Sequence, residues 1–168
     1  LLMLSTAIIT AAVTVFLYTP VSLIIFKIAE PSFGYPLKNE AGRLTIRNDV
    51  FGDGAFGATR SGGRAHSGVD IAAELNTPEY SSKSGIAFRG NVPTGYGKYI
   101  LIYHPDGTQT LYGHLSGWAV NTGKQIRKGD LIGFVGKTGN AANKSILAHL
   151  HFEIRSDGDP VDPVGAMQ

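Results

Sequence analysis

Apolar and polar residues alternate in several short stretches of the chain. The clearest alternation covers residues 98–104, and a second covers 108–115, with Pro105-Asp106-Gly107 between them. Side chains of a strand point alternately to its two faces, and Pro followed by Gly favours a tight turn. The two stretches therefore predict an antiparallel hairpin. Further short strands are predicted at 69–73, 86–89, 125–127, 131–135 and 149–155.

Hardly any segment after residue 44 shows the helical period of about 3.6 residues. The chain contains 22 glycines and 8 prolines, which are spread along it rather than gathered in one tract. This distribution is typical of short strands joined by tight turns. We therefore predict an all-β domain over residues 45–168, built as a mostly antiparallel sheet or sandwich, with residues 157–168 as a loop.

The N-terminal stretch has a different pattern, because residues 1–26 carry no charged side chain. A helix needs about 20 apolar residues to span a bilayer. We predict a transmembrane anchor at residues 1–28 and a linker at 29–44, which is interrupted by Pro and Gly. A secretory signal peptide is the alternative, although its apolar core is usually shorter, about 7–15 residues.

Composition restricts the possible chemistry. The chain has no cysteine, which excludes a thiolate zinc site, a disulfide framework and a cysteine nucleophile. Any metal must be held by histidine and carboxylate side chains. The net charge of +2, from 15 basic and 13 acidic residues, is too small to indicate a nucleic-acid partner.

Two distant histidine stretches predict one metal site. In a strand, His149 and His151 share a face and stand roughly 7 Å apart. One zinc cannot easily bind both, because its bonds to nitrogen are about 2.0–2.1 Å long. His66 lies in a turn and Asp70 at the start of the next strand. Catalytic zinc sites use three protein ligands and leave a position for water, so His66, Asp70 and one of His149 or His151 predict a zinc hydrolase.

Seven short motifs follow one another in a fixed order between residues 66 and 155. They are His66-x-Gly68-x-Asp70-x-Ala72-Ala73, Thr77-Pro78, Gly95-Tyr96-Gly97, Tyr112-Gly113-His114-Leu115-Ser116, Lys128-Gly129-Asp130-Leu131-Ile132-Gly133, Gly136-x-Thr138-Gly139 and His149-Leu150-His151-Phe152-Glu153-Ile154-Arg155. With these motifs the chain resembles the LytM/lysostaphin-type zinc metallopeptidases, which cut peptide bonds in bacterial peptidoglycan.

The resemblance implies a role for each of five residues. It makes His66, Asp70 and His151 the ligands of one Zn²⁺ per chain, and His114 and His149 the catalytic pair. The implied chemistry is metal-assisted amide hydrolysis. His149 would take the proton of the attacking water and pass it to the leaving amine, and His114 would steady the oxyanion or position the water.

The resemblance also implies a substrate and a location. We expect a membrane-anchored endopeptidase that acts on peptidoglycan peptides, with its domain on the extracytoplasmic side of the cytoplasmic membrane. The alternative is a non-catalytic LytM-type binding module that regulates another cell-wall hydrolase. Such modules usually lose metal ligands, whereas this chain keeps every one. Asn76, Glu79 and residues 140–148 depart from the family pattern in loops expected to border the substrate groove.

Other polar residues have two interpretations each. Glu153 shares the face of His149 and His151, so it either orients a ligand or is a solvated carboxylate at a strand end. Tyr112, on the predicted face of His114, either donates to the oxyanion or is a packed aromatic residue. His104 is interpreted as a hairpin-end residue without a chemical role.

Charged residues near the motifs are also ambiguous. Substrate carboxylates or solvent are the alternative partners of Arg60, Arg64 and Arg155. The glycine-rich lead-in, residues 45–64, is expected to wrap irregularly beside the site. A latent enzyme, in which the lead-in blocks the zinc, would use Asn48, Asp49 or Asp53.

Overall fold

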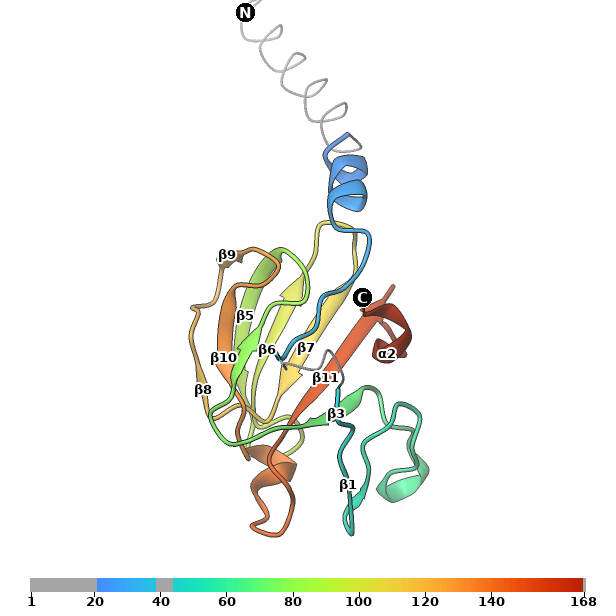
Figure 1. Cartoon of the computed structure of the whole chain (residues 1–168), viewed down its shortest axis with the longest axis vertical. Coiled ribbons are helices and arrows are strands. Elements are labelled where there is room, and N and C mark those ends of the chain that lie inside the picture. Colours follow the sequence, from blue (N-terminus) through green and yellow to red (C-terminus); the bar gives the residue numbers. More distant parts are fainter. Residues whose placement is uncertain (1–20, 39–43, 168) are drawn as a thin grey trace, which may run out of the picture. The chain divides into compact units, whose positions relative to one another are not determined.

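Antiparallel strands make up most of the regular secondary structure in this computed structural model, which describes residues 21–38 and 44–167 (Figure 1). The chain divides into two compact units, which part between Pro31 and Ser32. Residues 21–29 are helical. Most of the predicted membrane anchor, residues 1–20, lies outside the described residues. Within the described ranges, no helix combines the length and apolar character that crossing a bilayer requires.

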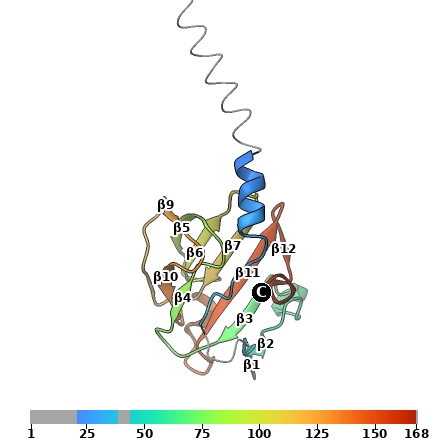
Figure 2. The ribbon, with the colours of Figure 1, turned by 45° about the horizontal axis from the view of Figure 1, so that its top comes forward.

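The largest sheet has seven strands, in the order β12-β11-β7-β6-β5-β9, with β3 paired to β11 beside β12. Figure 2 shows β3 and β12 along the same edge of β11. All the pairings are antiparallel. The strands are β3 (Val69–Ala72), β5 (Gly85–Asn91), β6 (Lys98–Tyr103), β7 (Gln109–Gly113), β9 (Lys124–Ile126), β11 (His149–Ser156) and β12 (Asp159–Val161).

Smaller elements complete the described part of the domain. A three-stranded sheet has the order β4-β10-β8, and β1 and β2 form a short hairpin in the lead-in. These elements are β1 (Asn48–Asp49), β2 (Gly52–Asp53), β4 (Pro78–Tyr80), β8 (Gly117–Trp118), β10 (Leu131–Phe134), the 3₁₀ turns η1 (Ser61–Gly63) and η2 (Gly139–Ala142), and the helix α2 (Pro163–Ala166).

The all-β prediction is confirmed, and each of the predicted strands has a counterpart in the structure. The β6–β7 hairpin turns at residues 104–107, where Gly107 has a φ of 86° and the backbone N–H of His104 donates to Thr108 O at 3.0 Å. The prediction of a loop over residues 157–168 was wrong. β12 pairs with the end of β11, and the side chain of Asp162 caps α2 by accepting from Val164 N.

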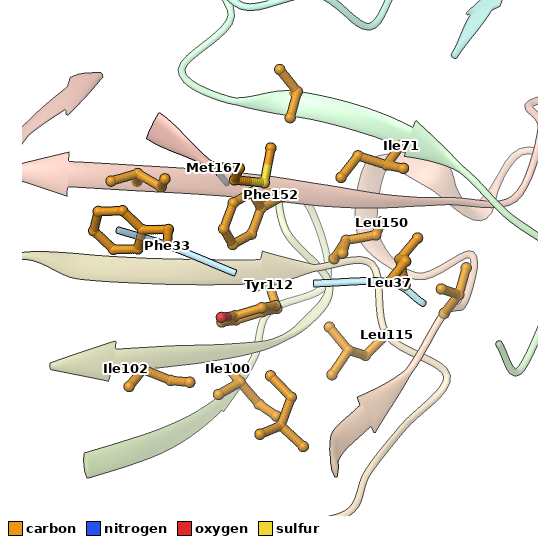
Figure 3. Close-up of a cluster of buried hydrophobic side chains, with 14 of the residues drawn as sticks. Phe33, Leu37, Ile71, Ile100, Ile102, Tyr112, Leu115, Leu150, Phe152 and Met167 are labelled. Carbon is orange, nitrogen blue, oxygen red and sulfur yellow. The ribbon is translucent and has the colours of Figure 1, made fainter. Parts of the chain in front are cut away.

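One face of β11 contributes to the hydrophobic core (Figure 3). The Phe152 ring lies 5.2 Å from the Tyr112 ring, centroid to centroid. Phe33 and Leu37, from the stretch predicted to be a linker, are buried in the same cluster. The backbone of Leu37 bridges to Glu79 in β4. Because side chains alternate along a strand, the other face of β11 carries His149, His151 and Glu153.

Candidate metal centre and catalytic cleft

Strand register brings the predicted ligands together. In the β3–β11 pair, His151 lies opposite Asp70, while His149 lies opposite Ala72. His66 precedes β3, and the lead-in holds its backbone, because His66 N donates to Ala58 O at 2.9 Å. A Cβ atom on Gly68 would lie 2.3 Å from the carbonyl oxygen of Phe152. Glycine is therefore needed for the chain to approach β11 this closely.

Three ligand atoms form a small triangle. The Oδ1 atom of Asp70 lies 2.9 Å from Nδ1 of His151 and 3.2 Å from Nε2 of His66. The two imidazole nitrogens are 3.1 Å apart. All three side chains are buried. Ligands of a tetrahedral zinc with bonds of about 2.0–2.1 Å stand about 3.3 Å apart, so this donor set fits the metal.

Glu153 supports His151, one of the two histidines of this triangle. It is 0% exposed, and its Oε1 atom accepts from Nε2 of His151 at 2.9 Å. The same oxygen accepts from the Tyr96 hydroxyl at 2.8 Å and from the Ser67 hydroxyl, and Arg155 donates to the other oxygen. Glu153 is therefore an orienting carboxylate and not a solvated one. It turns Nδ1 of His151 towards Asp70.

Two arginines hold the second oxygen of Asp70. Arg47 and Arg60 each donate to Oδ2 at 2.9 Å, which leaves Oδ1 for the ligand triangle. Burial would raise the pKa of Asp70, but hydrogen bonds from His151 and His66 hold it far below its usual value. Burial opposes a charge on His151 too, yet its hydrogen bonds to Asp70 and Glu153 raise its pKa. A metal ion would therefore have to compete with a proton for Nδ1 of His151.

Two further imidazoles stand beside the triangle. The His114 ring lies 4.9 Å from the His149 ring and 5.8 Å from the His151 ring, between centroids. Nδ1 of His149 contacts Leu147 O at 2.6 Å, and Nδ1 of His114 contacts Thr138 O at 2.9 Å. A carbonyl oxygen only accepts, so each Nδ1 carries the proton and each Nε2 keeps a free lone pair.

Both imidazoles are neutral at neutral pH. Burial lowers the pKa of His149, and burial together with the neighbouring His151 and His149 lowers the pKa of His114 to about 3. A neutral imidazole with a free nitrogen is able to accept a proton. The cluster thus combines three atoms that could hold a metal ion with two neutral imidazoles that each keep a free nitrogen.

The backbone at His114 explains how this side chain reaches the cluster. The prediction that His114 and Tyr112 share a face was wrong. Tyr112 is in the core, where its hydroxyl accepts from Ser82 N at 2.8 Å. His114 follows the end of β7 with a φ of 66°, and this left-handed conformation breaks the alternation of the strand.

Two glycine-containing loops hold His114 in place. Its N–H donates to Tyr96 O at 2.7 Å, and its ring contacts Thr138 O. These two loops meet at Gly97 and Gly139, which both have positive φ. A Cβ atom on Gly97 would lie 2.4 Å from the backbone nitrogen of Gly139. Glycines at both positions therefore let the loops touch and fix the imidazole.

A cleft of about 520 Å³ lies over the five site residues. Arg60 and Arg64 line it, whereas Arg155 is bound to Glu153. Asp49 accepts from Arg47 and from Leu147 N, and Asp53 accepts from Ala55 N. Neither carboxylate belongs to the group of ligand atoms found among the described residues. Two residues of the site were not predicted to have a role in it: Arg47, which holds Asp70, and Tyr96, which was noted only as part of a motif and donates to Glu153.

The model of peptidase family M23 matches residues 64–163 of the chain. The DD-carboxypeptidase/endopeptidase Mpg of Neisseria meningitidis serogroup B is 45% identical over 102 residues, which cover 60% of this chain and 22% of Mpg. A lipoprotein NlpD/LppB homologue of Pseudomonas aeruginosa is 36% identical over 110 residues, 65% of this chain and 35% of that protein. The chain thus spans about a fifth to a third of these relatives.

Solved structures share the fold. A zinc-containing peptidase from Vibrio cholerae superposes with a TM-score of 0.65 and 29% identity, over 79% of this chain and 39% of that one. The catalytic domain of lysostaphin, an antimicrobial peptidase from Staphylococcus simulans, has a TM-score of 0.58 and 30% identity. That match covers 66% of this chain and 86% of the lysostaphin domain.

Proposed function

Because this chain belongs to peptidase family M23, we propose that it is a zinc metalloendopeptidase that hydrolyses peptide bonds in bacterial peptidoglycan. The observation that carries the proposal is the ligand triangle, whose three atoms lie 2.9–3.2 Å apart, with two neutral imidazoles beside it. The similarity to Mpg, a DD-carboxypeptidase/endopeptidase, and to the lysostaphin peptidase domain supports the reaction class.

The metal would be held by Nε2 of His66, Oδ1 of Asp70 and Nδ1 of His151. A zinc ion held there would lower the pKa of a coordinated water towards neutrality and would polarise the scissile carbonyl. Arg47 and Arg60 hold Oδ2 of the Asp70 carboxylate and thereby turn Oδ1 towards the metal position. Glu153 fixes the tautomer and the orientation of His151.

His149 and His114 would handle the proton and the developing negative charge. His149 accepts a proton at Nε2, 4.0 Å from Asp70 Oδ1, while Leu147 O holds its Nδ1–H. It then returns this proton to the leaving amine. His114 is placed by Thr138 O on the other side of the pair and stabilises the tetrahedral oxyanion or orients the water.

We further propose that the chain acts in the bacterial envelope, anchored by residues 1–28, with residues 45–168 as the peptidase domain. The uncharged run 1–26 and the lipoprotein relative support this location. The full chain should remain with the membrane pellet after alkaline carbonate extraction. Recovery of the protein in the supernatant would contradict the anchor without affecting the proposed chemistry.

The reaction is tested by measuring zinc content and the new amino termini released from purified peptidoglycan. His66→Ala and Asp70→Ala should lose the metal, because each removes a ligand. His114→Ala should keep zinc and lose turnover. His104→Gln is the control, since this imidazole is bound to Thr110 and Ser84 O, away from the cleft, and should keep both properties.

Each outcome separates the alternatives. One zinc per chain with new amino termini supports the endopeptidase. Bound zinc with an intact wall would indicate a latent enzyme or a different substrate. A chain that binds no zinc would overturn the proposal in favour of a binding module that regulates another hydrolase, and a zinc-free His114→Ala protein would overturn the division of roles.

A further inference from the structure

The charges that line the cleft are mostly positive. Three arginines, Arg47, Arg60 and Arg64, stand there with a single acidic residue, Asp70. Arg47 is buried, and its two terminal nitrogens bind Asp49 and Asp70. Asp70 is thus already compensated by guanidinium groups, and a metal ion would add more positive charge. The cleft is therefore suited to an anionic ligand.

Arg64 differs from the other two arginines. Its side chain is exposed and makes no hydrogen bond or ion pair within the described part of the chain. Arg60 is only partly engaged, because it donates from Nη2 to Asp70 and from Nη1 to the carbonyl of Asp53, and 21% of its side chain is exposed. Both residues line the cleft.

The turn between these two arginines has a defined backbone. Arg60 N donates to Arg64 O at 2.8 Å, and Gly63 N donates to Arg60 O at 3.1 Å. Gly62 and Gly63 have positive φ values of 78° and 72°, which glycine adopts readily. The turn η1 therefore brings Arg60 and Arg64 to its two ends. Because Arg60 also binds Asp70, the two arginines at the ends of this turn lie next to the ligand triangle.

We propose that Arg60 and Arg64 form a subsite for a carboxylate group of the peptide substrate, close to the bond that is cut. This inference rests on the proposed peptidase function and names the charge that its substrate must carry. A guanidinium presents paired N–H donors that match the two oxygens of a carboxylate. Arg64 supplies the free donors, and Arg60 fixes the subsite relative to Asp70.

Two kinds of carboxylate could occupy this subsite, and matched substrates separate them. One pair of cross-linked stem peptides ends in a free carboxylate or in a carboxamide. A second pair carries a diamino acid with its carboxylate free or amidated beside the scissile bond. For each pair, the ratio of kcat/KM for the charged peptide to that for the amidated peptide reports on the subsite.

The test variant is Arg64→Gln, and the matched control is Arg127→Gln. Arg127 is exposed, lies outside the cleft lining and carries the same charge. We expect the full-length wild type to prefer the charged member of one pair. Arg64→Gln should lower that ratio about three- to tenfold, mainly through KM, the range expected for a partly exposed ion pair with good geometry. Arg127→Gln should leave the ratio unchanged.

The results distinguish this subsite from the proposed function. Equal kcat/KM for both members of each pair, or equal effects of the two substitutions, would overturn the subsite and leave the peptidase intact. Failure of the wild type to cleave any of the four peptides or peptidoglycan would overturn the peptidase itself. The pair whose ratio falls in Arg64→Gln identifies the carboxylate that is bound.

Discussion

Glu79 is a carboxyl group that is buried without a hydrogen-bond partner, and we expect its replacement to stabilise the fold. It lies in β4, opposite Gly133, and is 0% exposed. Neither of its carboxyl oxygens has a hydrogen-bond partner among the described residues. Burial raises the pKa of Glu79 well above its ordinary value. An apolar side chain of similar size should therefore fit this position better.

We expect Glu79→Leu to increase the free energy of unfolding at neutral pH. Leaving a buried polar group unsatisfied costs about 1–3 kcal/mol, which Leu would recover. For a folded unit of this size, the gain corresponds to a rise in Tm of about 3–10 °C. Glu79→Gln is the matched control, because it removes the titrating group but keeps a buried polar one.

The contribution of Glu79 to the free energy of unfolding should change with pH in a definite direction. A raised pKa means that the folded state holds its proton more tightly than the unfolded state, so wild-type stability falls as pH rises from about 4.5 through the raised pKa. The advantage of Glu79→Leu should be smallest at low pH and should grow towards neutral pH. Thermal unfolding followed by circular dichroism, with a chelator present throughout, measures this difference. A variant no more stable than wild type, or a difference independent of pH, would refute the reasoning.

Two further predictions concern the site. Glu153→Gln should weaken zinc binding about 10–100-fold, because His151 loses its charged orienting partner. Competition with a chelating dye measures the affinity, and an unchanged value would contradict the orienting role of Glu153. Gly97→Ala should lower turnover far more than zinc affinity, because its Cβ atom would press on Gly139 and displace the loops that hold His114. Gly123→Ala is its control, with a φ of 81° but no atom within 4 Å of the added Cβ, and equal losses in both variants would exclude crowding as the cause.

Local alternation was enough to predict the central strands and to place His149 and His151 on one face. It left open which of the two joins Asp70, because that depends on register. In the structure His151 is opposite Asp70, whereas His149 is two pairs away on β11, opposite Ala72. Register is set by two strands about eighty residues apart in the chain, so no local pattern encodes it.

Other features were missed for equally physical reasons. His114 leaves the expected face because of a positive φ, which the loops around Gly97 and Gly139 impose. β12 is only three residues long, and its pairing depends on the end of β11. Arg47 precedes Asp70 by 23 positions and belongs to no motif, so only the folded chain reveals that it holds this carboxylate.

On the proposed function, metal binding depends on the register in which β3 pairs with β11. A slip of one residue would put Leu150 or Phe152 opposite Asp70 and turn His151 towards the core, so the triangle would vanish. A chain folded in the wrong register would therefore contain every residue of the site and still be unable to load the ion. The proposed hydrolase would therefore become active only after β3 and β11 had paired in the correct register.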